Sequence, residues 1–116
     1  MSQLAAAVAI VTTGSATDPH GTTVSAFMSL SLDPPMVLVS LDQRSSLLAL
    51  LAEGASIGIN VLSTGQNVLA RRFATKGVDR FAGVEWVMAD GAPQLVGNHT
   101  WVAGRVAQMI ATGDHV

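Results

Sequence analysis

The stretch that decides the fold is Thr-Val-Ser-Ala-Phe-Met-Ser-Leu-Ser-Leu-Asp-Pro-Pro, residues 23–35. Its polarity alternates, which predicts a β-strand because successive strand side chains point to opposite faces. Apolar residues stand at the even positions from 24 to 32 and are expected to face a core, whereas hydroxyls occupy most odd positions. We expect one strand over 22–33, ended by Pro34 and Pro35, which lack the amide hydrogens that a sheet requires.

The hydroxyl-rich face of this strand has two interpretations. Short hydroxyls allow a planar ligand to approach closely and can hydrogen-bond to its polar edge, whereas an ordinary solvent face is expected to carry Lys and Glu. A solvent face rich in Ser and Thr is nevertheless compatible with an alternating strand, and periodicity alone favours it. The alternation therefore predicts the strand and leaves the ligand open.

The segments around this strand predict a mainly β domain with two short helices. Further strands are expected over 6–13, 36–42, 57–61, 84–88 and 101–111, with a turn over 14–21. The strand over 36–42 is apolar on both faces at its start, which predicts a central, covered position. Leucines over 46–53 predict a helix capped by Ser45, and the capping box at 63–66 predicts a second helix to Ala74. An antiparallel barrel fits this order better than a doubly wound sheet.

Composition restricts the class of protein further. The chain has 116 residues, of which 49% are hydrophobic and 12% are charged, and its mean hydropathy is +0.45. One small core does not need this much apolar surface, which favours a subunit interface over an unusually well-filled core. The sequence contains no cysteine, which excludes disulfides and thiolate chemistry.

Charge and hydropathy patterning argue against several partners. The net charge is −2 and the six Lys and Arg residues are scattered, so no nucleic-acid partner is expected. No apolar run reaches the length of a membrane-spanning helix, and the start of the chain lacks a basic segment typical of a signal peptide. We therefore expect a cytoplasmic protein. His20, His99 and His115 lie in separate segments without paired spacing, so no metal site is expected.

A family resemblance rests on collinear blocks at residues 23–35, 37–46, 57–62, 72–74, 79–84 and 113–115. Their order and spacing from about residue 8 to 116 resemble the flavin reductase-like, FMN-binding split-barrel family. Ala26 departs from the family pattern, in which Ser is frequent. The resemblance implies a split β-barrel with antiparallel, Greek-key-like connections that forms a homodimer. Because family members usually continue beyond the block at 113–115, we expect a single domain over 1–116 that lacks its last strand or strands.

The resemblance also implies an activity. It predicts an NAD(P)H-dependent flavin reductase that transfers a hydride from NADH or NADPH to FMN or FAD. Such a protein is typical of the short-chain reductase components that supply reduced flavin to a separate monooxygenase. In this class the flavin carries the redox chemistry, and the protein supplies alignment and exclusion of water. A flavin-binding protein without turnover is the main alternative, and a purely structural dimerisation domain is a third.

Candidate site residues follow from both lines of argument. The turn at 42–46 combines an expected helix N-terminus with hydroxyls and Arg44, which suits an anion, although a plain helix cap has the same features. The resemblance places the flavin phosphate at this turn and His115 beside the nicotinamide or flavin ring, in an orienting role. Arg72 and Asn60 also have purely structural explanations, at a helix end and against a packed helix. The expected cofactor-binding residues are Thr23, Val24, Ser25, Ala26, Ser29, Ser40, Leu41, Asp42, Arg44, Ser45, Ser46, Asn60, Arg72 and Phe73.

Overall fold

The computed structural model describes residues 8–24 and 27–116. Its strands are β1 (Ala9–Gly14), β2 (Pro19–Val24), β3 (Phe27–Leu32), β4 (Pro35–Val39), β5 (Ser56–Val61), β6 (Trp86–Ala89), β7 (Ala92–Leu95) and β8 (Thr100–Arg105). The helical elements are the 3₁₀ turns η2 (Leu48–Leu50) and η3 (Thr64–Gln66) and the helix α1 (Asn67–Arg72). The strands pair antiparallel throughout this part of the chain, which confirms the predicted mainly β, antiparallel class.

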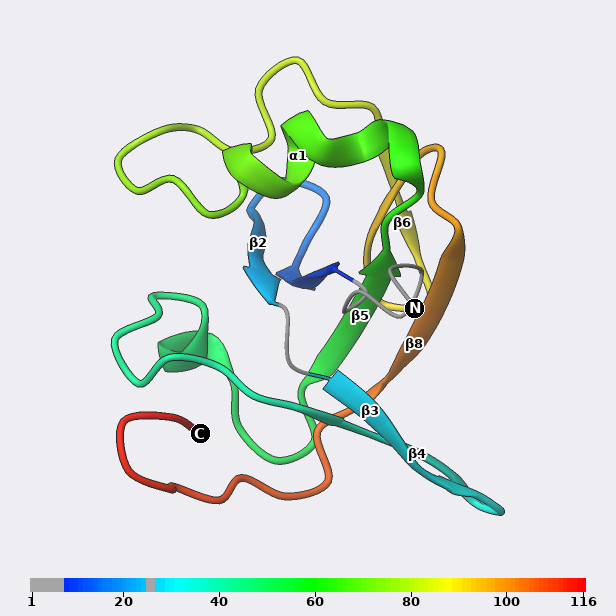
Figure 1. The fold of residues 1–116 in the computed structure, drawn as a ribbon, viewed down its shortest axis with the longest axis vertical. Helices are drawn as coiled ribbons and strands as arrows, with labels where there is room; N and C mark the ends of the chain where they lie inside the picture. The colour runs from blue at the N-terminus through cyan, green and yellow to red at the C-terminus, as the bar shows by residue number, and fades with distance from the viewer. Residues whose placement is uncertain (1–7, 25–26) are drawn as a thin grey trace, which may run out of the picture.

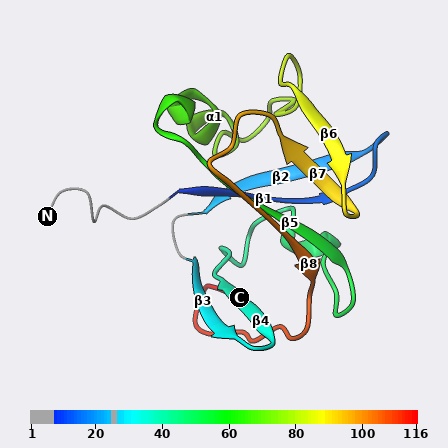
Figure 2. The same ribbon diagram turned by 90° about the vertical axis from the view of Figure 1, so that its right-hand side faces the viewer.

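A four-stranded sheet in the order β2-β1-β5-β8 forms the centre of the molecule. The hairpins β3–β4 and β6–β7 form two further sheets of two strands each. In Figure 2, α1 and the β6–β7 hairpin lie on one side of the central sheet, and β3–β4 lies with the C-terminal segment on the other. The β3–β4 hairpin extends away from the rest of the chain as an arm (Figure 1).

The single long strand expected over 22–33 is wrong. β2 ends at Val24 and pairs with β1, whereas β3 begins at Phe27 and pairs with β4 in a different sheet. Residues 25 and 26 between them lie outside the described part of the chain. Alternating polarity is the same for one continuous strand and for two strands in succession, so periodicity could not detect the change of sheet.

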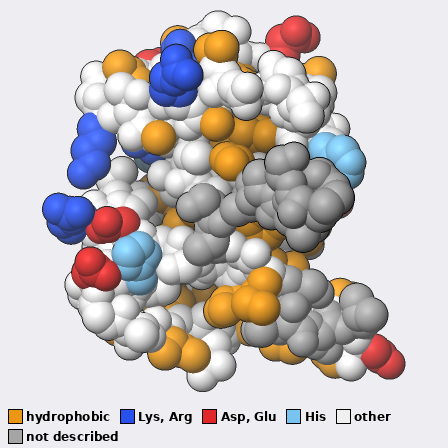
Figure 3. Space-filling model, in the orientation of Figure 1, with side chains coloured by type: hydrophobic (Ala, Val, Ile, Leu, Met, Phe, Trp, Pro, Cys, Tyr) orange, Lys and Arg blue, Asp and Glu red, His pale blue; other side chains and the backbone are white. Residues whose placement is uncertain are grey.

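The central position expected for residues 36–42 is also wrong. β4 pairs with β3 in the two-stranded arm, and Met36, Val37 and Leu38 are 43%, 40% and 46% exposed. Met28, which was expected to face a core, is 56% exposed on the same arm. In Figure 3 a group of apolar side chains lies where the arm joins the rest of the molecule. In this fold, the run that is apolar on both faces is therefore exposed surface that favours association, and it does not mark the centre of a sheet.

Three predicted elements differ in extent. The helix expected over 46–53 is reduced to the single turn η2, and the second helix ends at Arg72 rather than at residue 74. The predicted capping box at its start is confirmed, because the amide of Ser63 donates to Oε1 of Gln66 at 2.8 Å. β8 ends at residue 105 instead of 111.

Two segments contain strand residues that were not expected there. His20, predicted to lie in a surface turn, belongs to β2 and pairs with Thr13 of β1. β7 was not predicted at all, because Pro93 at its centre argues against a strand in a sequence. A short hairpin strand tolerates this proline, since β7 pairs only with β6 in its own sheet.

The core consists of two clusters, one on each face of β1. Ala9 and Val11 pack with Val24, Leu41, Leu47 and Ile59 on one face. Ile10 packs on the other face with Phe73, Phe81 and Leu95. β1 is an inner strand that is covered on both sides, so its side chains are buried at successive positions. The first cluster anchors the segment that contains Leu41 and Leu47, and the second anchors the segment between Phe73 and Phe81.

Gly21 of β2 lies directly against the second cluster. A Cβ atom at this position would lie 2.9 Å from Cε2 of Phe73 and 3.3 Å from Cζ of Phe81. The two rings meet edge to face with their centroids 5.0 Å apart, so neither can retreat without disturbing the other. The missing side chain of Gly21 therefore allows both phenylalanines to pack on β2.

We predict that Gly21→Ala lowers the free energy of unfolding by about 1–3 kcal/mol, the usual cost of overpacking a filled core. Gly65→Ala is the matched control, because a Cβ there meets no atom within 4 Å and the backbone φ is not positive. Urea denaturation of the two variants and the wild type measures the difference. Equal stability of the two variants would contradict this account of Gly21.

Candidate functional site

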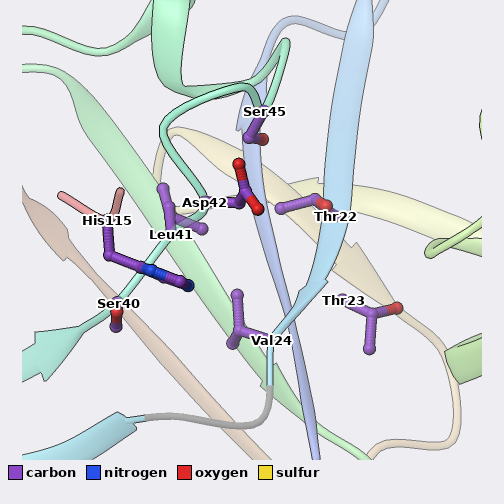
Figure 4. Close-up of a pocket in the computed structure, with 8 residues that line it drawn as sticks. All are labelled: Thr22, Thr23, Val24, Ser40, Leu41, Asp42, Ser45 and His115. Atoms are coloured by element: carbon purple, nitrogen blue, oxygen red, sulfur yellow. The ribbon is translucent and has the colours of Figure 1, made fainter. Parts of the chain in front are cut away.

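A pocket opens where β2, the segment after β4 and the last residues of the chain meet (Figure 4). This hydroxyl pocket has a volume of about 200 Å³ and is lined by Thr22, Thr23, Val24, Ser40, Leu41, Asp42, Ser45 and His115. A larger groove of about 680 Å³ adjoins it and shares Thr22, Thr23, Asp42 and Ser45. The groove is lined by residues 19–23, 42, 44–47, 74 and 76–81. The combined site has the size and the polar lining of a small-ligand site.

Backbone pairing brings the end of the chain to the pocket. The amide of Leu41 donates to the carbonyl of Val116 at 2.8 Å, and the amide of Val116 donates to the carbonyl of Leu41 at 2.9 Å. The amide of Gln43 donates to the carbonyl of Asp114 at 2.7 Å. His115 therefore lies opposite Asp42, although 73 positions separate them in the sequence.

A tight turn directs the last residues back toward this pairing. Thr112 and His115 exchange two backbone hydrogen bonds around Gly113 and Asp114. The backbone φ of Gly113 is +64°, a conformation that glycine adopts without steric cost. The Gly-Asp-His sequence thus has a structural reason for its first residue: it lets the chain turn so that His115 reaches the pocket.

The orientation of His115 is set by its neighbour. Nδ1 of His115 lies 2.8 Å from Oδ1 of Asp114, and this hydrogen bond lowers the pKa of the Asp114 carboxyl. An ionised carboxylate only accepts hydrogen bonds, so Nδ1 carries the hydrogen and Nε2 remains available to a ligand. Figure 4 shows the imidazole extending from the C-terminal segment toward Val24 of β2.

The two threonines of β2 have opposite orientations. Figure 4 shows Thr22 directed toward Asp42 and Thr23 directed away from it. Oγ1 of Thr23 donates to the carbonyl of Ala70 at 2.6 Å, and its amide donates to the carbonyl of Phe73 at 3.2 Å. Thr23 therefore fastens the C-terminal end of α1 to β2 and satisfies a carbonyl that the helix leaves open.

Thr22 is a site residue that the sequence analysis missed. It shares the face of Val24, which was assigned to the core because it is apolar. Val24 is indeed buried, at 6% exposure, yet it also lines the hydroxyl pocket. The signal that could have identified Thr22 was its position near the end of the strand, not its polarity. Side chains near a strand end can lie beyond the core even though they share a face with core residues.

Asp42 and Arg44 form an ion pair at the junction of pocket and groove. Oδ1 of Asp42 accepts from the backbone amide of Arg44 at 2.8 Å and from its Nε at 3.2 Å. Oδ2 of Asp42 accepts from Nη2 of Arg44 at 3.3 Å. These bonds lower the pKa of Asp42 to about 2 and raise the pKa of Arg44. Asp42 is therefore an anion at neutral pH, and its backbone bond orders the turn.

The loop over residues 74–83 forms the far wall of the groove and was also missed. Arg80 holds it against β2, with Nη1 donating to the carbonyl of Gly21 at 2.7 Å and Nε donating to the carbonyl of Thr75 at 2.9 Å. Burial lowers the pKa of Arg80. Lys76 and Val78 line the groove from this loop. They stand outside any regular element, so no periodicity marked them.

Three expected site residues are used within the fold. Asn60 is 0% exposed, and its Oδ1 accepts from the amide of Leu95 at 2.7 Å and from Nδ2 of Asn98 at 2.6 Å. The side chain of Arg72 donates to backbone carbonyls of the 74–83 loop at 2.7–2.8 Å. Phe73 is 0% exposed in the second core cluster. None of the three lines the site: Arg72 and Phe73 support its far wall, whereas Asn60 joins β5 to β1 and β7 in the core.

The other expected residues fall into those that line the hydroxyl pocket, those that line the groove and those that lie elsewhere. The hydroxyl pocket brings together Thr23, Val24, Ser40, Leu41, Asp42, Ser45 and His115. Arg44 and Ser46 line the adjoining groove. Ser29 belongs to β3, in the projecting arm, and Ser25 and Ala26 lie outside the described residues. The 42–46 turn therefore belongs to the site, although the expected helix after it is only the short η2.

Charge divides the site into two ends. Among the described residues that line the hydroxyl pocket, Asp42 and His115 are the titratable ones. Those that line the groove include three cations, Arg44, Lys76 and Arg80, and two carboxylates, Asp42 and Asp79. The arrangement suits a ligand with an uncharged polar ring at one end and an anionic group at the other.

Residues 8–24 and 27–116 lack two features that would point to other classes of protein. No group of three or more His, Cys, Asp or Glu side chains is placed there to hold a metal ion. No helix in that part of the chain has the length and apolar character needed to cross a membrane.

The fold and the site together define an antiparallel β domain with a small-ligand pocket that continues into a cationic groove. Residues 1–116 match the family model for the flavin reductase like domain. The chain therefore belongs to this family, and the predicted membership is confirmed.

Named relatives give the same result. The chain is 39% identical over 112 residues to the NADH:FMN oxidoreductase of Rhodococcus erythropolis, covering 95% of this chain and 58% of that protein. It is 37% identical over 118 residues to the NADH:riboflavin 5'-phosphate oxidoreductase of Streptomyces pristinaespiralis, covering 99% and 67% respectively. The chain thus spans between half and two thirds of the length of these curated relatives.

Solved structures show the same fold. The NADH:FAD oxidoreductase of Streptomyces globisporus, solved in complex with NAD and FAD fragments, superposes with a TM-score of 0.87 at 34% identity, covering 95% of this chain and 67% of that one. The styrene monooxygenase flavin reductase of Pseudomonas putida S12 superposes with a TM-score of 0.85 at 31% identity, covering 95% and 73%. These similarities confirm the predicted fold class.

The depressed pKa of Asp42 predicts when its ion pair stabilises the turn. A carboxyl whose pKa is lower in the folded protein adds stability above its unfolded pKa and loses it as the pH falls through the folded pKa. The contribution is therefore present above about pH 4 and lost between about pH 4 and 2. A carbon-detected NMR titration should give a midpoint of about 2 for Asp42, which Arg44→Gln raises toward 3.8. A wild-type midpoint near 3.8 would contradict the pairing.

Proposed function

We propose that this chain is an NAD(P)H-dependent flavin reductase domain that transfers a hydride from reduced nicotinamide to FMN or FAD. The observation that carries the proposal is the position of His115 at a hydroxyl-lined pocket in a member of the flavin reductase like family. The relatives named above are NADH oxidoreductases that use FMN or FAD, which favours NADH as the reductant.

The residues of the site fit a flavin. Thr22, Ser40 and Ser45 offer hydroxyls that can donate to or accept from the polar edge of a flat ring. Val24 and Leu41 supply apolar surface beside them, which suits the body of an aromatic ring system. The cations of the groove suit the phosphate, so the two ends of the site match the two ends of the cofactor.

The reaction requires little acid–base chemistry from the protein. A bound flavin would supply the redox chemistry, because it accepts the hydride that reduced nicotinamide releases. His115, held by Asp114, presents Nε2 at a fixed position from which it can orient a ring by a hydrogen bond. Val24 and Leu41 restrict water on one side of the pocket. The chain's contribution is therefore binding and alignment.

The proposal includes a protein partner. Relatives include the reductase component of a 4-nitrophenol monooxygenase of Rhodococcus opacus, 37% identical over 111 residues. The flavin reductase of styrene monooxygenase is a structural neighbour. We infer that this chain supplies reduced flavin to a separate monooxygenase. Its cytoplasmic location, expected from the sequence, stays a prediction.

We predict that the purified protein oxidises NADH only when FMN or FAD is added. Thr22→Val should weaken flavin binding because it removes a pocket hydroxyl, without a change in thermal stability. Thr23→Val should instead lower the free energy of unfolding by about 1 kcal/mol, since it breaks the bond to Ala70. Absorbance at the nicotinamide band, flavin titration and thermal unfolding measure the three effects.

Two results would overturn parts of this proposal. Flavin binding without nicotinamide oxidation would leave a flavin-binding protein that performs no turnover, the alternative weighed from the sequence. A folded protein that shows no flavin binding at all would remove the flavin proposal entirely. Equal effects of the two threonine variants on flavin affinity would contradict the assignment of Thr22 to the pocket.

We also propose that the domain forms a homodimer through the β3–β4 arm. The arm exposes Met28, Met36, Val37 and Leu38, each at 40% or more, and such surface favours association. Leu38→Asp should therefore shift the protein from dimer to monomer in sedimentation velocity experiments. Val68→Asp is the control, because Val68 is 76% exposed on α1, away from the arm. A monomeric wild type would contradict the dimer.

A further inference from the structure

The cations that line the groove differ in what already binds them. The guanidinium of Arg80 donates to backbone carbonyls that belong to the fold, those of Gly21 and Thr75. Lys76 has no ion-pair partner among the described residues. Arg44 is engaged by a side chain, the carboxylate of Asp42, through Nε and Nη2. Lys76 and Arg44 are therefore the cations that a ligand can engage without breaking the backbone arrangement, and of these two Arg44 is the one that a carboxylate already binds.

The partner of Arg44 is weakly held and well placed to compete with a ligand. The side chain of Arg44 is 83% exposed and that of Asp42 is 43% exposed. Ion pairs this open to water contribute little stability, so an incoming anion can exchange with the carboxylate. Asp42 also lines both the hydroxyl pocket and the groove. Its negative charge therefore lies where a ligand would extend from the hydroxyl pocket into the groove.

We propose that Asp42 determines specificity at this site because its carboxylate competes with the phosphate of the flavin for the guanidinium of Arg44. The inference rests on the proposed flavin binding and adds a residue that opposes it. Asp42 weakens binding of a phosphorylated flavin more than it affects binding of unphosphorylated riboflavin. Asp42 also fixes the backbone of Arg44 at the groove, because its Oδ1 accepts from the Arg44 amide.

Asp42→Asn separates these two roles. The asparagine side-chain oxygen can still accept from the Arg44 amide, so the turn is retained while the negative charge is removed. We expect Asp42→Asn to tighten FMN binding about two- to fivefold relative to riboflavin binding, the range of an exposed ion pair. In an Arg44→Gln background the same substitution should change FMN affinity little, because no guanidinium is left to compete for.

The experiment is a fluorescence titration of wild type, both single variants and the double variant with FMN and with riboflavin. Glu53→Gln is the matched control, because it removes one negative charge from an exposed side chain that lines neither the hydroxyl pocket nor the groove, and it should leave the FMN-to-riboflavin affinity ratio unchanged. Circular dichroism and thermal unfolding check that every variant is folded.

Three results would overturn the inference. An unchanged FMN-to-riboflavin ratio in Asp42→Asn shows that Asp42 does not oppose phosphate binding. Equal tightening in the Arg44→Gln background shows simple repulsion and not competition for Arg44. Failure of the wild type to bind either flavin removes the proposed function itself, and this outcome is distinct from the other two.

Discussion

Burial of β1 on both faces is the constraint on which the rest of the structure depends. Alternate residues of this strand enter two separate clusters, and each cluster anchors one wall of the site. Val11 packs in the cluster that holds Leu41 and Leu47, which flank the 42–46 turn. Ile10 packs in the cluster that holds Phe73, just before the far loop, and Phe81, near the end of that loop. The position of both walls is therefore set by the hydrophobic effect acting on one strand.

The site lies between these walls, with β2 at its base. Pairing of the C-terminal residues with the segment around Asp42 adds His115 at one end, and the loop held by Arg80 adds cationic charge at the other. A pocket with hydroxyls and few charges thus continues into a groove rich in cations. This gradient along one surface is the physical reason that the site suits a ring attached to a phosphate, and family membership gives that ligand its chemical identity.

The sequence predicted the fold class and the location of the site better than the roles of single residues. Alternating polarity identified strand residues on both sides of residue 25, yet it could not detect that β2 and β3 enter different sheets. It could not distinguish Thr22 from Thr23 either, because their roles depend on Asp42 and on the carbonyl of Ala70, both remote in sequence. Likewise, Asn60 was expected at the ligand because its neighbours are small, but long-range hydrogen bonds place it in the core. Periodicity did not assign the 42–46 turn or His115 to the site. Their assignment depended on the family resemblance, which for the turn added to the chemistry of its residues.

The central claim is that the ligand lies between β2, the 42–46 turn and the C-terminal segment, and amide chemical-shift mapping with FMN tests it most directly. The account predicts that FMN perturbs the backbone resonances of Thr22, Asp42, Ser45 and His115, with Lys76 responding at the phosphate end. Resonances of the β6–β7 hairpin should remain unchanged, because that hairpin lies on the opposite side of the central sheet (Figure 2). Perturbations confined to β6–β7 or to the β3–β4 arm would contradict the account.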